Sequence, residues 1–320
     1  MTARAWRGAV REYAGLGLVV LVLVAAFGLA TEHFFTAATF RTIANQIPAA
    51  LVVAVGMTFV LVVASIDLSV GSVLALSGAV LGAGLVDLGM GLPLALAACL
   101  LTGLACGALN GLVVVRWGIP SFIVTLGMME MARGGAYLVT GSRTRYIGPA
   151  VEGIADASVL GLSLPFVAAL LVVGLGQVVL SRTVFGRYMV AVGTSEEAVR
   201  LSGIDTGAVK AAVFVLSGLL AALGAVLHTA RLGSADPNAG AGFELQAIAA
   251  VVIGGTSLLG GRGSVLSSFF GVVIMAVLGT GLAQVGVQDP SKRLITGGVI
   301  VAAVIADRYR HGGRAQGTGP

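Results

Sequence analysis

The chain has 320 residues, of which 57% are hydrophobic and only 10% are charged, and its mean hydropathy is +1.02. This composition excludes an ordinary soluble protein and predicts an integral membrane protein, whose 48 glycines indicate closely packed helices. The net charge of +5 comes from arginines that lie mostly beside apolar runs, which indicates membrane orientation and argues against a nucleic-acid partner.

Apolar runs of about 20 residues predict helical spans, and this length has room for about ten of them in a single transmembrane domain, 1–320. Arg4, Arg7 and Arg11 precede the first run, so we expect a retained helix with its N-terminus in the cytoplasm. The C-terminus is expected on the same side, with short tails at 1–12 and 307–320. The expected spans are 13–30, 45–64, 67–87, 92–115, 122–140, 162–180, 211–230, an interrupted segment at 245–264, 265–283 and 294–306.

Polar residues interrupt the apolar runs at two places. Asp67 and Ser69 lie in the first break, where an ionised carboxylate in hydrocarbon would cost several kcal/mol unless it is hydrogen-bonded. We interpret Asp67 as the cap of the following helix in preference to a substrate contact. The second break, 254–264, is glycine-rich and contains Thr256 and Ser257. Both breaks lead into Gly-Ser-Val-Leu, and such interrupted segments in two halves of a chain point to a translocation path.

Glu130 and Arg133 lie in the expected span 122–140, where their spacing places them on one helix face and predicts mutual neutralisation. Charges inside a membrane are functional candidates, and a pair this close is equally often structural. The three histidines are widely separated, so spacing predicts neither a metal site nor a bound cofactor.

The longest strongly polar stretch lies in the loop 182–210. Within it, Thr194 to Ser202 predicts one short helix, with Thr194 and Glu197 as a capping box, Arg200 near the negative end and Gly203 as a left-handed stop. A helix of about two turns is not stable alone in water, so it must pack against this chain or a partner.

Five segments in order carry a resemblance to a known family: 65–72, 120–127, 185–203, 231–238 and 248–264. Together they resemble the permease subunits of bacterial ribose-type sugar ABC importers. The resemblance covers about residues 43–306. Glu130, where a small or uncharged residue is expected, and Ser65, where glycine is commoner, depart from the pattern and leave the substrate open.

The resemblance implies an all-α polytopic homodimer in the bacterial cytoplasmic (inner) membrane that imports a ribose-like monosaccharide. It also implies two partners, an ABC ATPase subunit and a soluble extracytoplasmic sugar-binding protein. In that family the loop corresponding to 182–210 docks into the ATPase through a cytoplasmic coupling helix. The matching residues here are Glu196, Glu197, Ala198, Arg200, Leu201 and Gly203.

Other functions remain open on sequence alone. The chain lacks a Gly-x4-Gly-Lys-Ser/Thr loop, so we expect a transporter subunit whose ATP hydrolysis is supplied by another chain, not an enzyme. A branched-chain amino-acid ABC permease of the same superfamily would require paired charges, for which Glu130 and Arg133 are the candidates. A proton-coupled secondary transporter could use Asp67 or that pair.

Overall fold

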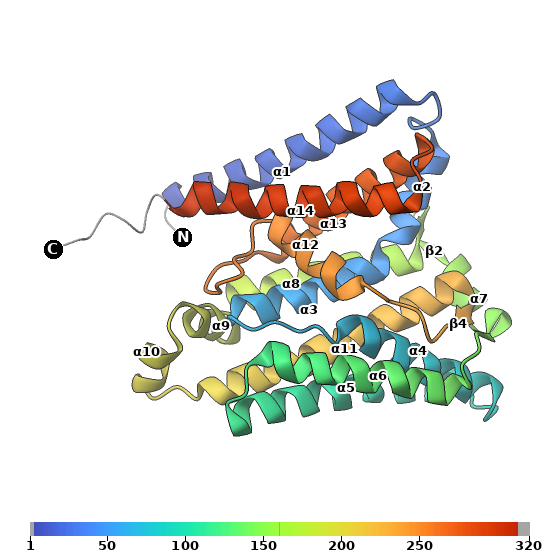
Figure 1. The fold of residues 1–320 in the computed structure, drawn as a ribbon, viewed down its shortest axis with the longest axis horizontal. Helices are drawn as coiled ribbons and strands as arrows, with labels where there is room; N and C mark the ends of the chain where they lie inside the picture. The colour runs from blue at the N-terminus through green and yellow to red at the C-terminus, as the bar shows by residue number, and fades with distance from the viewer. Residues whose placement is uncertain (1–2, 160, 313–320) are drawn as a thin grey trace.

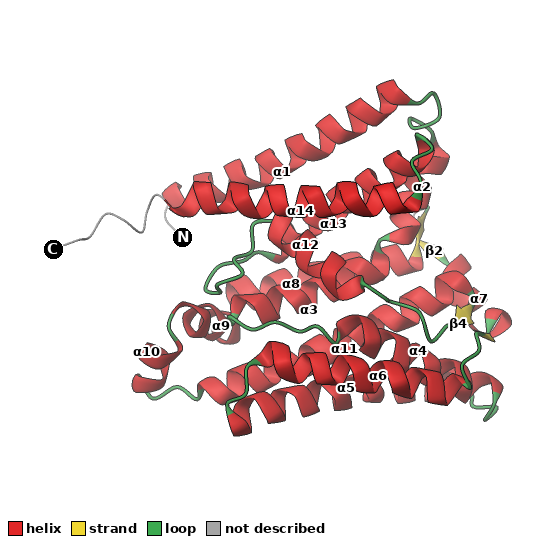
Figure 2. Cartoon of the chain, in the orientation of Figure 1, coloured by secondary structure: helices red, strands yellow, loops and turns green. Residues whose placement is uncertain are grey.

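The computed structural model describes residues 3–159 and 161–312, which form a mostly helical bundle (Figures 1 and 2). Residues 1–2 and 313–320 of the predicted tails lie outside the described residues. The helices are α1 (Ala3–Ala30), α2 (Ala37–Gln46), α3 (Pro48–Val62), α4 (Val70–Val86), α5 (Leu92–Trp117), α6 (Ser121–Thr140), α7 (Gly148–Asp156), α8 (Leu164–Arg182), α9 (Val184–Thr194), α10 (Glu196–Leu201), α11 (Thr206–Leu232), α12 (Phe243–Ile253), α13 (Val265–Gln284) and α14 (Asp289–Gly312).

The helices include several that can cross a membrane, which agrees with a polytopic membrane protein. Among the described residues, part of α1 and the whole of α5, α8, α11 and α13 are long and apolar enough, and the bent pair α2 and α3 would make a sixth span. The predicted count of about ten is therefore not confirmed. Two further apolar helices, α4 and α12, have only 17 and 11 residues, and α6 carries Glu130 and Arg133.

Several predicted boundaries differ from the observed ones. The expected span 45–64 begins at the end of α2 and contains α3, and these two helices meet at an angle of 45°. Pro48 is the first residue of α3, where its missing N–H breaks no helical hydrogen bond. The stretch between the expected spans 265–283 and 294–306 is partly helical, with α14 beginning at Asp289. In the expected interrupted segment 245–264, the helix α12 ends at Ile253 and the remainder has no regular helix before α13.

α11 lies at the centre of the bundle, where it packs against α3, α4 and most extensively against α5. The contact with α5 brings the two backbones together at Gly103, Gly107 and Gly218. A Cβ atom at Gly107 would overlap the carbonyl oxygen of Phe214, and one at Gly218 would overlap that of Gly103. Small residues at this spacing permit the close helix contact on which association in lipid depends.

The two short apolar helices, α4 and α12, begin side by side in the middle of the bundle (Figure 1). A Cβ atom at Gly71 of α4 would overlap the carbonyl oxygen of Gly240 and lie 2.5 Å from Oε2 of Glu244. The repeated Gly-Ser-Val-Leu does not mark equivalent positions, because its first copy lies inside α4 and its second begins before α13. The structural likeness of the two breaks is instead that each adjoins a short apolar helix, α4 or α12.

Short strands and an ion pair fasten the end of the bundle opposite α10. β1 (Arg145–Tyr146) pairs antiparallel with β4 (Ser234–Ala235), and β2 (Ser158–Val159) pairs with β3 (Leu162–Ser163). Arg145 also contacts Asp87 at the end of α4, at 3.3 Å. This ion pair ties the C-terminal end of α4 to β1, which precedes α7.

Replacing Gly107 with alanine should lower the stability of the bundle. The added methyl group would overlap the Phe214 carbonyl and lie 3.1 Å from Cα of Val215, which should cost about 1–3 kcal/mol. Thermal unfolding in detergent measures this loss. Gly174→Ala in α8 is the control, because nothing lies within 4 Å of the added atom. Equal melting temperatures for the two variants would contradict the close α5–α11 contact.

Candidate functional site

The first interrupted segment, 63–69, crosses the bundle interior without helical structure between α3 and α4. Its backbone groups need partners, because no water is available at membrane depth to satisfy them. The amides of Ile66 and Leu68 donate to the hydroxyl oxygens of Ser121 (2.9 Å) and Thr125 (3.1 Å) on α6. The Thr125 hydroxyl in turn donates to the Ile66 carbonyl. Side chains of α6 therefore replace the helical hydrogen bonds that this segment lacks.

Asp67 is the centre of a buried hydrogen-bond network and is only 2% exposed. Its Oδ1 accepts from the amide of Ser69 (2.9 Å) and from the Ser69 hydroxyl (2.6 Å). Its Oδ2 accepts from the hydroxyl of Ser217 on α11 at 2.8 Å. The Nδ2 of Asn110 on α5 donates to the Ser69 hydroxyl oxygen at 3.0 Å. The network thus joins the interrupted segment to two neighbouring helices.

The interpretation of Asp67 as the helix cap is wrong in its geometry. The N-cap residue of α4 is Ser69, whose side chain makes no capping hydrogen bond. Asp67 instead binds the amide two residues further on, as short polar side chains do in turns. Sequence reasoning missed Ser217 and Asn110. An amide side chain in the middle of the apolar helix α5 was the one available signal for Asn110.

The second interrupted segment, 254–264, folds back against the end of α3. The amide of Gly261 donates to the carbonyl oxygen of Val62 at 2.9 Å. Thr256 is buried, and its hydroxyl has no hydrogen-bond partner within the described part of the chain. Ser257 is half-buried, and its hydroxyl oxygen accepts from the amide of Leu259 at 3.2 Å. The two interruptions therefore touch one another at one end of the bundle.

Glu130 and Arg133 do not form the predicted pair, since the ion pairs among the described residues do not include them. Arg133 reaches across to the loop before α12, where Nη1 donates to the carbonyl oxygens of Pro237 and Ala239, the latter at 2.8 Å. Glu130 is exposed on the surface of α6. The prediction of mutual neutralisation is wrong because backbone carbonyls distant in the sequence satisfy the guanidinium group.

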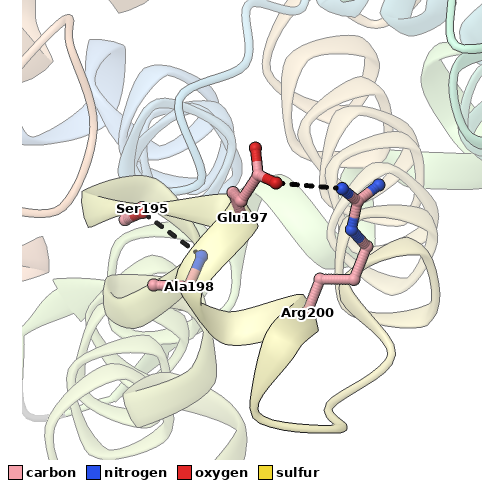
Figure 3. Close-up of polar contacts among 4 residues, drawn as sticks. All are labelled: Ser195, Glu197, Ala198 and Arg200. Carbon is pink, nitrogen blue, oxygen red and sulfur yellow. Dashed lines mark hydrogen bonds and ion pairs between the residues drawn. The ribbon is translucent and has the colours of Figure 1, made fainter.

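The knob, which we define as α9 and α10 (residues 184–201), lies at the bundle end where α1 begins and α14 ends (Figure 1). Figure 3 shows that the cap of α10 is Ser195, whose hydroxyl oxygen accepts from the amide of Ala198 at 3.3 Å. The prediction of Thr194 as the cap is therefore wrong by one residue. Thr194 ends α9, and its hydroxyl donates to the carbonyl of Val190.

As the sequence predicts, α10 carries acidic residues in its first turn and a basic residue in its last turn. Glu197 and Arg200 form an exposed ion pair at 3.5 Å (Figure 3), and Glu196 pairs with Lys210 on α11. Leu201 ends the helix with 79% of its surface exposed. Gly203 follows with φ = 80°, which confirms the left-handed stop.

A cavity of about 650 Å³ separates α10 from the first interrupted segment. Ser65 and Ile66 line one side, and Glu196, Arg200 and Lys210 line the other. The described residues contain no group of three or more His, Cys, Asp or Glu side chains that could hold a metal ion. The serine, glutamate, arginine and lysine side chains that line the cavity can form hydrogen bonds and ion pairs.

Residues 39–304 match a family model described as a branched-chain amino acid transport system permease component. The chain belongs to this permease family. The permease is 39% identical over 303 residues to the ribose import permease protein RbsC of Escherichia coli K12, with 92% of each chain covered. Over 310 residues it is 36% identical to the fructose import permease protein FrcC of Rhizobium meliloti, covering 92% of this chain and 85% of that protein.

A third relative is the L-arabinose ABC transporter permease protein AraH of Azospirillum brasilense. The permease is 34% identical to it over 301 residues, covering 94% of this chain and 88% of that protein. No solved structure matches the chain. Family membership and the apolar helices together establish a multi-pass membrane transport protein.

Replacing Asp67 with alanine should reduce the folded yield of the permease more than it changes any solute preference. The change leaves three donors of Ser69 and Ser217 without their acceptor, and each buried unpaired group costs about 1–3 kcal/mol. Ser217→Ala is the matched variant, because it removes one donor and leaves the other two bonds. Size-exclusion yield and thermal unfolding in detergent measure both. A well-folded Asp67→Ala variant with altered specificity would contradict the structural role.

Proposed function

We propose that the permease is the membrane-spanning subunit of an ATP-driven importer that passes a small, ribose-like sugar from a soluble binding protein across the bacterial cytoplasmic membrane. The observation that carries this proposal is the identity of 34–39% over about nine-tenths of the chain to proteins named for importing ribose, fructose and L-arabinose. Such close similarity over the full fold supports the same architecture and the same class of solute.

The amino-acid alternative has weaker support, although the family description names branched-chain amino acids. A zwitterionic solute calls for opposite charges that are free to face it. Arg133 is engaged by two loop carbonyls, and only Glu130 is left exposed. The proton-coupled carrier is also less well supported, because both carboxylate oxygens of Asp67 accept hydrogen bonds inside the bundle.

The knob is our candidate for the cytoplasmic coupling helix, within the loop 182–210, that meets a separate ATPase subunit. Leu201 exposes an apolar side chain at the tip, and Glu197 and Arg200 form a surface ion pair that contributes little to folding. These residues, with Glu196, Ala198 and Gly203, are therefore available for a partner. A hollow of about 410 Å³ between α9 and α10 offers a further contact surface.

The proposed contact between the knob and the ATPase sets the orientation of the permease in the membrane. If α10 meets a cytoplasmic ATPase, the beginning of α1 and the end of α14 lie on the cytoplasmic side, because they share that end of the bundle (Figure 1). The strand pair β1 and β4 then faces the binding protein. We propose a homodimer in the lipid bilayer, with as many as ten membrane-embedded segments if the short helices α4 and α12 are counted.

The translocation path is proposed to pass the junction where α4 and α12 begin. Helices that start inside a membrane expose free amide groups, and these require protein or water as partners. Glu130 lies halfway along α6 and is exposed, which in a bilayer requires contact with water or with a second subunit. Asp67, Ser69, Thr256 and Ser257 are proposed to shape this path rather than to bind the sugar.

Reconstituted vesicles test the proposed function. Permease combined with its ATPase and binding protein should accumulate labelled ribose, fructose or arabinose only when ATP is present on the ATPase side. Labelled leucine is the comparison solute and should not accumulate. Leucine uptake without sugar uptake would refute the sugar assignment, and uptake by the permease alone would refute the ATP-driven mechanism.

Replacing both Glu197 and Arg200 with alanine should weaken co-purification of the ATPase and reduce sugar uptake. The two side chains are mostly exposed and, within residues 3–159 and 161–312, form an ion pair with one another, so the permease should stay folded. Glu152→Ala is the control for co-purification of the ATPase, because Glu152 is exposed on α7 at the opposite end of the bundle. Intact co-purification and unaltered uptake in the double variant would contradict the docking role.

A further inference from the structure

The knob meets the end of α3 and the second interrupted segment through backbone atoms at one place. Gly193, in the last turn of α9, lies so close that an added Cβ atom would overlap the carbonyl oxygen of Val62 and come within 2.5 Å of the Gly261 amide nitrogen. The same Val62 carbonyl accepts the Gly261 amide at 2.9 Å. We call the contact of Gly193, Val62 and Gly261 the three-way joint.

Neighbouring residues leave the joint no space for side chains. A Cβ atom at Gly260 would lie 2.6 Å from that of Ala64 and 2.8 Å from the Gly193 carbonyl oxygen. One at Gly261 would lie 2.6 Å from Oγ1 of Thr194. Both glycines have positive φ, at 84° and 72°, and Ala64 itself has φ = 55°. Packed backbone cannot absorb a displacement by changing rotamers, so movement of one segment displaces the others.

Outside the joint, α10 stands away from the first interrupted segment. The cavity of about 650 Å³ lies between Glu196 and Arg200 on α10 and Ser65 and Ile66 on that segment. Ser195, which is not helical, joins α10 to α9. A push on α10 therefore has two routes to residues 63–69. One passes through α9 and the joint, and the other passes through α11, which pairs with Glu196 through Lys210 and bonds Asp67 through Ser217.

We propose that the three-way joint is the transmission point at which movement of the knob is passed to the segment that carries Asp67. This inference rests on the proposed function, in which an ATPase moves the knob. Ala64 follows Val62 by two residues, and the segment beyond it is bonded to α6 through Ser121 and to α11 through Ser217. A displacement at the joint thus reaches helices on two sides of the proposed path. Gly193 is a positioning residue in this scheme.

Gly193→Ala in the complete reconstituted complex tests the joint. The expected result is that ATPase association and ATP hydrolysis persist while sugar uptake per ATP falls by about tenfold or more, since a misplacement of about 1 Å can cost that much in an enzyme active site. Gly174→Ala, in open space on α8, should keep the wild-type ratio. A role in folding alone would lower the amount of complex and leave the ratio of sugar to ATP unchanged.

A second variant decides the question if Gly193→Ala fails to fold. Ala64→Gly adds no atom and suits the left-handed backbone at that position, so the melting temperature should not fall. Its added backbone freedom should still lower the ratio of sugar to ATP. Wild-type ratios in whichever of these variants fold would overturn the inference. Failure of the unmodified complex to import sugar would instead refute the proposed function.

Discussion

The rest of the structure depends on how an unwound segment is kept inside an apolar bundle. Residues 63–69 lack helical hydrogen bonds, and membrane interiors supply no water to replace them. Hydroxyl groups of α6 accept hydrogen bonds from the backbone of this segment. The Asp67 carboxylate accepts hydrogen bonds from Ser69 in the segment itself and from Ser217 on α11. This arrangement lets α4 begin inside the bundle, where its first turn meets that of α12.

Residues 63–69 also connect the knob to α4. One end of this segment adjoins the knob at the three-way joint, where only glycine fits at position 193. The other end leads into α4, whose far end is held by the ion pair of Asp87 and Arg145. A segment bonded by several separate hydroxyl groups can exchange those partners stepwise. It is thus better suited to two alternative arrangements than a continuous helix would be.

Sequence reasoning predicted the features that depend on local chemistry. Apolar runs located most of the helices, and Gly203 was correctly placed as a left-handed stop. The α10 cap was misplaced because Thr194 and Ser195 are both good caps and only packing selects between them. The pairing of Glu130 with Arg133 failed for a different reason, since Pro237 and Ala239 lie about a hundred positions away. Ser217 and Asn110 were missed because their partners are also distant in sequence.

The central claim is that the knob and residues 63–69 move together when the ATPase acts. Hydrogen–deuterium exchange on the complete complex, compared with and without bound ATP, measures it most directly. The amides of Ile66, Leu68 and Ser69 are each bonded to a side-chain oxygen, so rearrangement of the segment changes their exchange. The account predicts that these amides and those of α10 change together on ATP binding. A change confined to α10, with residues 63–69 unaffected, would contradict it.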